Sequence, residues 1–169
     1  MEKCVVFYDD STFEKGFAED LCAGVENRSA QPATVCGDSM IYRENASVVG
    51  FVIHSRQGNL SKEMKNLLNR IVMPKNNYIF IVISSGVKER HSLRTAFSFL
   101  QSRGYVVSKV FTEGVLHSVS GKRKEQIQAI IRAIDERHDD CLVCEQLSSK
   151  KLRKDIRHYI NEIRNNNSK

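Results

Sequence analysis

The sequence predicts an α/β fold in which helices cover both faces of a doubly wound, five-stranded parallel sheet of order 2-1-3-4-5, with an extra helix at the C-terminus. Two observations support this prediction. Strand-like and helix-like segments alternate along the 169 residues, and the clear strands are continuous apolar runs without polar alternation. Strands that are apolar on both sides are typical of a parallel sheet with helices on each face.

Five segments are expected to form the strands of this sheet. Four are runs rich in β-branched and aromatic residues, and the fifth is a short, weak run. The first run stops abruptly at Asp9 and Asp10, and residues 78–83 give the clearest strand pattern. The predicted strands are residues 3–8, 33–36, 47–53, 78–83 and 105–111.

Apolar side chains at helical spacing predict the covering helices. Ser11 or Thr12 can cap the first helix, and Ser61 is expected to cap the second. Pro74 should stop the second helix, and Gly104 should terminate the third. The predicted helices are residues 13–26, the segment between Ser61 and Pro74, and residues 92–103, 121–138 and 150–164.

The positive charge of the chain is concentrated near the C-terminus. Residues 148–169 contain seven Lys or Arg and two Asp or Glu, so they hold +5 of the net charge of +6. We therefore expect one nearly neutral α/β domain over residues 1–147 and a basic amphipathic helix within residues 148–169 that packs on it. This distribution argues against sequence-specific nucleic-acid binding and leaves at most weak contact of the basic segment with polyanions.

Composition also limits location and metal chemistry. The longest apolar runs have six residues, whereas a membrane-spanning helix needs about 20, so no membrane span is expected. The N-terminus does not resemble a secretory leader, and five cysteines are an odd number, so we expect reduced thiols in a cytoplasmic protein. Cys141 and Cys144 form a C-x-x-C without a second ligand pair, which predicts no metal site. No sequence motif assigns a catalytic residue.

Three loops follow predicted buried strands and should meet at the carboxyl edge of the sheet, where ligands of open parallel sheets bind. The first loop places Ser11 and Thr12 at the start of a helix. Free backbone N–H groups there suit a phosphate, although either hydroxyl could instead serve only as the helix cap.

The order of these segments resembles the flavodoxin family, and in particular short bacterial flavodoxin domains. The run Val5-Val6-Phe7-Tyr8 with its hydroxyl-bearing turn is similar to the family's first strand and phosphate loop. Residues 49–61 and 78–86 are similar to its third and fourth strands with their following loops, and the likeness covers roughly residues 3–135. The resemblance implies FMN, with its phosphate in the first loop and its ring beside the other two. The implied cofactor-binding residues are Asp10, Ser11, Thr12, Phe13, Ser55, Arg56, Gln57, Gly58, Ser84, Ser85 and Gly86.

The first loop departs from the family pattern, which alternates hydroxyl residues with Gly and Asn. It contains no early glycine, and Asp9 and Asp10 would place negative charge beside a phosphate dianion. The second loop lacks an aromatic residue that could stack on a flavin, although the plane of Arg56 can stack on a ring.

Two functions therefore remain open. The first is an FMN-binding electron-transfer protein or small flavin-dependent reductase with a redox partner protein, which the topology and the loop positions favour. The alternative is a domain of the same fold that has lost FMN and acts as a binding or interaction module, which the altered first loop and the basic tail favour.

Overall fold

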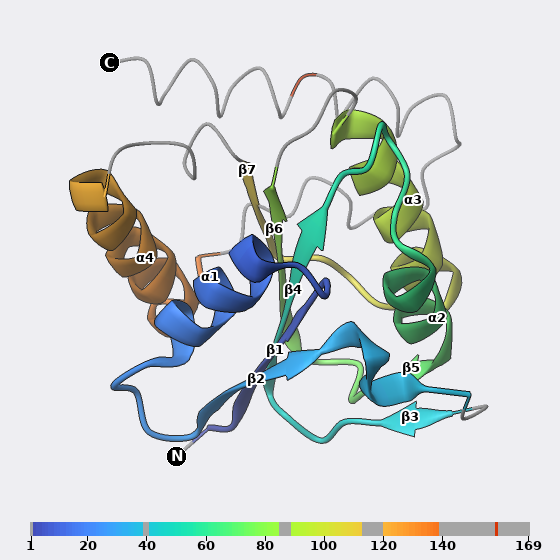
Figure 1. Cartoon of the computed structure of the whole chain (residues 1–169). Helices are drawn as coiled ribbons and strands as arrows, with labels where there is room; N and C mark the ends of the chain where they lie inside the picture. Colours follow the sequence, from blue (N-terminus) through green and yellow to red (C-terminus); the bar gives the residue numbers. More distant parts are fainter. Residues whose placement is uncertain (1, 39–40, 85–88, 113–119, 139–157, 159–169) are drawn as a thin grey trace.

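The computed structural model describes residues 2–38, 41–84, 89–112, 120–138 and 158. Five parallel strands form one sheet in the order β2-β1-β4-β6-β7 (Figure 1). Numbered by their own order along the chain, these strands follow the sequence 2-1-3-4-5, so the predicted fold class is confirmed. The strands are β1 (Cys4–Tyr8), β2 (Arg28–Pro32), β4 (Val48–His54), β6 (Tyr78–Ser84) and β7 (Lys109–Thr112).

Helices cover both faces of this sheet. Figure 1 shows α1 (Thr12–Cys22) and α4 (Ser120–Asp135) on one face, and α2 (Lys62–Arg70) and α3 (Glu89–Ser102) on the other. Side chains alternate between the two faces along each central strand. In β1, for example, Phe7 joins the core under α2 and α3. Two apolar clusters, one on each side of the sheet, therefore form the core.

A glycine in β4 makes room for an aromatic ring from the next strand. Gly50 and Phe80 are partners in the register of β4 and β6. A Cβ atom on Gly50 would lie 2.2 Å from Cζ of Phe80, which is closer than atoms can pack. The Phe80 ring therefore fills the space that a side chain at position 50 would occupy.

The prediction of a strand over residues 33–36 is wrong. The second strand of the sheet is β2, and Ala33–Cys36 forms a short 3-10 helix, η1. The five residues of β2 are all half-buried because, within the described residues, the strand lies at the edge of the sheet and pairs with β1 alone. An edge strand without an apolar run is hard to recognise in the sequence. The apolar Ala33 and Cys36 suggested a buried strand, but they are buried residues of η1.

Several predicted boundaries also shift. Helix α1 ends at Cys22 and not at residue 26, because Ala23 takes an extended conformation and Gly24 follows with φ +71°. Strand β7 starts at Lys109 and not at residue 105, although Tyr105 is buried and its hydroxyl accepts a hydrogen bond of 2.9 Å from the Met73 N–H.

A second, two-stranded parallel sheet was not predicted. It consists of β3 (Tyr42–Arg43) and β5 (Ile71–Val72), and in Figure 1 it lies beside η1. Strand β5 directly follows α2, which ends at Arg70 and therefore well before Pro74.

The predicted tail helix over residues 150–164 lies outside the described residues apart from His158, as do Cys141 and Cys144. The domain boundary at residue 147 and the packing of the tail stay predictions. Among the described helices, none is long and apolar enough to cross a membrane.

Candidate functional site

The candidate site lies at the carboxyl edge of the sheet, where β1, β4 and β6 end next to one another. The chain leaves β1 toward α1 and β2 on one side of the strand order, and it leaves β4 toward α2 and β6 on the other. This divergence makes the boundary between β1 and β4 the topological switch point, which is where open α/β sheets bind ligands.

Asp9, the residue after β1, is fully buried at this edge. Its Oδ2 accepts a hydrogen bond of 2.8 Å from the backbone N–H of His54, and its Oδ1 accepts one from the hydroxyl of Ser61. Burial raises the pKa of the Asp9 carboxyl above its ordinary value, although these two hydrogen bonds oppose the rise. The negative charge of Glu14 raises this pKa further.

Glu14 brings a second buried carboxylate to the same edge, from the third position of α1. Its Oε1 accepts a hydrogen bond from the hydroxyl of Ser84 and lies 3.0 Å from Nδ1 of His54. The same Nδ1 lies 3.2 Å from the oxygen of Ser84. The other carboxylate oxygen, Oε2, is buried and has no hydrogen-bond partner among the described residues.

The carboxylate of Glu14 does not form the helix-capping contact that its spacing from Ser11 would allow. Ser11 and Glu14 have the spacing of a capping box, in which the helix-cap hydroxyl and the carboxylate bond each other's backbone N–H groups. Ser11 makes its half, because its hydroxyl accepts from the N–H of Glu14 at 3.4 Å. The N–H of Ser11 instead donates to the carbonyl of Asp9 at 2.7 Å. The Glu14 carboxylate is thus committed to Ser84 and His54.

The other predicted residues of the first loop lie around this pair of carboxylates. Ser11 is the cap of α1, and Asp10 and Thr12 are exposed. Phe13 is half-buried, with its ring centroid 6.4 Å from that of Phe17 in a stacked arrangement.

The predicted residues of the second loop do not converge on one point. Ser55 is buried, and its hydroxyl lies 2.8 Å from that of Ser92 on α3. Arg56 and Gln57 are exposed on a tight turn that Gly58 completes with φ +88°. From the third loop, Ser84 belongs to the carboxylate network, whereas Ser85 and Gly86 lie outside the described residues.

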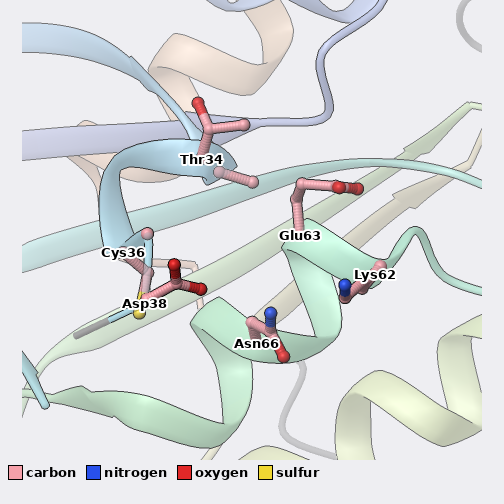
Figure 2. Close-up of a pocket in the computed structure, with 8 residues that line it drawn as sticks. Thr34, Cys36, Asp38, Lys62, Glu63 and Asn66 are labelled. Carbon is pink, nitrogen blue, oxygen red and sulfur yellow. The ribbon is translucent and has the colours of Figure 1, made fainter. Parts of the chain in front are cut away.

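A pocket of about 170 Å³ lies next to this edge, between η1 and α2 (Figure 2). Ligand pockets for small organic molecules usually measure roughly 300–1,000 Å³, so this one suits a smaller group. None of the predicted site residues contributes to its wall, which consists of Ala33, Thr34, Cys36, Gly37, Asp38, Lys62, Glu63 and Asn66.

Comparison with solved structures gives the same strand arrangement. FerB, a flavoenzyme NAD(P)H:(acceptor) oxidoreductase from Paracoccus denitrificans, superimposes with a TM-score of 0.51 at 15% identity, over 81% of this chain and 99% of that one. A candidate quinone reductase from Klebsiella pneumoniae gives 0.53 at 10% identity, over 84% and 87% of the two chains. This chain has a flavodoxin-like fold. No protein-family model matches the sequence, and no curated protein sequence does.

The flavodoxin-like fold implies FMN, but the first loop does not fit the FMN phosphate. A phosphate needs hydrogen-bond donors and positive charge. The side chains of Asp9 and Glu14 are instead buried carboxylates, which are negatively charged and only accept hydrogen bonds. Three nearby donors, the hydroxyls of Ser61 and Ser84 and the backbone N–H of His54, already bond these carboxylates. Within the described residues, no group of three or more His, Cys, Asp or Glu side chains could hold a metal ion.

Sequence reasoning named the first loop but missed its central groups. In the sequence, Asp9 indicated only a charge that weakens phosphate binding, and no pattern singled out Glu14. The spacing of Ser11 and Glu14 was visible, but it predicts a local capping box. Only the fold brings Glu14 to His54 and Ser84, which lie 40 and 70 residues away in the chain.

Proposed function

We propose that this chain is a flavodoxin-like domain that has lost the binding of FMN through its first loop and acts as a binding or interaction module. The observation that supports the proposal is the pair of buried carboxylates, Asp9 and Glu14, at the carboxyl edge of β1 and the first turn of α1. A phosphate dianion placed there would be repelled by two charges that water does not screen.

The donors around these carboxylates strengthen the argument. A buried anion is stable only when hydrogen-bond donors surround it, and an anionic ligand would need donors as well. Ser84 bonds Glu14, while Ser61 and the backbone of His54 bond Asp9. The chain therefore uses these three donors for its own carboxylates, so they are not available to a bound phosphate.

The second candidate is an FMN-binding electron carrier or small flavin-dependent reductase with a redox partner protein. It is favoured by the shared fold, because the similar structures include proteins described as a flavoenzyme NAD(P)H oxidoreductase and as quinone reductases. FMN would supply the redox chemistry. The exposed Arg56 and Gln57, on the loop after β4, would then be the residues available to edge the ring.

Titration with FMN and with riboflavin, which lacks the phosphate, separates the two candidates. For the native chain we expect no quenching of flavin fluorescence that depends on the phosphate. Replacement of the buried carboxylate by a small hydroxyl, Glu14→Thr, should increase the affinity for FMN and for inorganic phosphate but not for riboflavin. Glu19→Thr is the matched control, because Glu19 is an exposed acid on the same helix.

Two results would contradict the proposal. Native protein that is yellow as purified, or that binds FMN with a Kd of about 1 μM, equivalent to about −8 kcal/mol, and prefers it to riboflavin would establish the second candidate. An equal gain of FMN affinity in Glu14→Thr and Glu19→Thr would show that general charge, and not the buried carboxylate, keeps the phosphate away.

A further inference from the structure

His54 is held at the carboxyl edge in a single orientation. It is the last residue of β4, and its backbone N–H is fixed by Asp9 at 2.8 Å. Its ring is held from one side by Glu14 and Ser84, which are both buried, while the His54 side chain is 37% exposed. One ring nitrogen thus faces the protein interior, and part of the ring is accessible.

The hydrogen bonds around Nδ1 determine where the imidazole carries its proton. The hydroxyl proton of Ser84 has two oxygen acceptors, Oε1 of Glu14 and, at 3.4 Å, the carbonyl of Ile53. Ser84 therefore presents a lone pair to Nδ1 of His54, and so does the Glu14 carboxylate. Because both neighbours of Nδ1 are acceptors, Nδ1 must carry a hydrogen.

The opposite ring nitrogen then has a free lone pair. A neutral imidazole with a hydrogen on Nδ1 has an unprotonated Nε2, which is a hydrogen-bond acceptor. Within the part of the chain that the structure describes, no polar group bonds Nε2 of His54. A carboxylate bonded to Nδ1 holds the imidazole in the tautomer and the orientation in which Nε2 can take a proton.

We propose that Nε2 of His54 is the proton acceptor of this edge, and that the ligand it takes is a weak acid with a hydroxyl group and no phosphate. The proton moves from the ligand oxygen to Nε2, the electron pair of the broken O–H bond stays on the ligand, and the imidazolium is held by Glu14. This inference rests on the proposed function, because the choice of a ligand without phosphate follows from the proposed loss of phosphate binding at this edge.

The side chains around His54 agree with this choice of ligand. Glu14 bonds the ring of His54, Asp9 bonds its backbone N–H, and the positive charge of Arg56 acts on Asp9. Two carboxylates stabilise the positive charge that His54 gains with the proton. The same two carboxylates repel a dianionic ligand, so the edge distinguishes a hydroxyl compound from its phosphate ester.

The first test is the tautomer of His54, read by nitrogen-15 NMR of the full chain. We expect hydrogen on Nδ1 and a free Nε2 of His54 in the native protein. His91 is the contrast, because its Nδ1 lies 3.3 Å from the guanidinium of Arg94, which can only donate, so neutral His91 should carry its hydrogen on Nε2. The double variant Glu14→Ala, Ser84→Ala removes both acceptors and should abolish this preference. A native His54 with its hydrogen on Nε2 would mean that Glu14 itself carries the proton, and would overturn the proposal.

The second test uses 4-nitrophenol and 4-nitrophenyl phosphate, which differ only in the phosphate. At a pH where NMR shows His54 to be neutral, 4-nitrophenol should bind, shift the Nε2 resonance to its protonated position and increase the nitrophenolate absorbance. The phosphate ester should produce none of these three effects. His54→Gln should lose the response to 4-nitrophenol, and His91→Gln should keep it.

The outcomes separate this inference from the proposed function. An unchanged Nε2 resonance in saturating 4-nitrophenol, or an equal response in His54→Gln, would overturn the role of His54 while leaving the loss of phosphate binding intact. Tight FMN binding by the native chain would overturn the proposed function instead, whatever tautomer His54 holds.

Discussion

The hydroxyl of Ser84, at the end of β6, donates a hydrogen bond to the buried carboxylate of Glu14 in the first turn of α1. This contact joins two elements that lie 70 residues apart in the chain. It also determines the chemistry of the carboxyl edge, because it holds a negative charge of the protein at the start of a helix, where a ligand anion would otherwise be attracted.

Truncation of this carboxylate should lower the stability of the fold. In Glu14→Ala, the hydroxyl of Ser84 and Nδ1 of His54 lose a buried acceptor, and a buried donor without a partner costs about 1–3 kcal/mol. Glu14→Gln keeps the shape and one acceptor oxygen, so it should cost less. Urea unfolding followed by circular dichroism measures the difference. If the exposed Glu19→Ala is as destabilising as Glu14→Ala, the network does not contribute to stability.

The buried Asp9 predicts a pH dependence of stability with a definite sign. Its pKa is higher in the folded protein than in the unfolded chain, chiefly because of burial. The folded state therefore binds this proton more tightly, and the contribution of Asp9 to the free energy of unfolding is greatest at acid pH. That contribution should fall as the pH rises from the ordinary range of an aspartate, about 3.9, through the raised pKa.

This prediction is tested by comparing the native chain with Asp9→Asn over a series of pH values. The native chain should lose stability relative to the variant as the pH rises. A relative gain with rising pH would show that the hydrogen bonds from Ser61 and His54 outweigh burial, and that the pKa of Asp9 is lowered.

Two serines that cap helices should differ in importance. The hydroxyl of Ser61 accepts from the Met64 N–H at 3.0 Å and donates to Asp9, and the residue is buried. The hydroxyl of Ser11 accepts from the Glu14 N–H at 3.4 Å and is half-buried. Removal of a helix cap costs about 0.5–2 kcal/mol. The loss of stability in Ser61→Ala should reach or exceed the upper end of this range, and the loss in Ser11→Ala should be near its lower end.

Thermal unfolding of these two variants measures the difference. In addition, Ser61→Ala should raise the pKa of Asp9 further, because the Ser61 hydroxyl stabilises the charged carboxylate. Equal stability losses in the two variants would mean that Ser61 acts as a cap and nothing more.

The sequence predicted the central strands because their identity depends on local composition. Residues 78–83 are apolar on both sides, and such a run has few alternatives in a domain of this size. It did not predict β2, whose residues are half-buried and pair with β1. The site was only partly predictable for the same reason. The position of the loops follows from the fold class, whereas the partners of Glu14 follow from the folded geometry.

The contact between Gly50 and Phe80 gives a prediction about the core. The added methyl group of Gly50→Ala would lie 2.2 Å from Cζ of Phe80, and both residues lie in central strands of the sheet, where the backbone cannot easily move away. Overpacking of this kind costs about 1–3 kcal/mol. A second substitution, Phe80→Leu, shortens the opposing side chain and should remove part of the clash. The double variant should therefore be more stable than the sum of the two single effects predicts, as measured by urea unfolding of all four proteins. Strictly additive effects would show that the ring of Phe80 does not cause the loss of stability in Gly50→Ala.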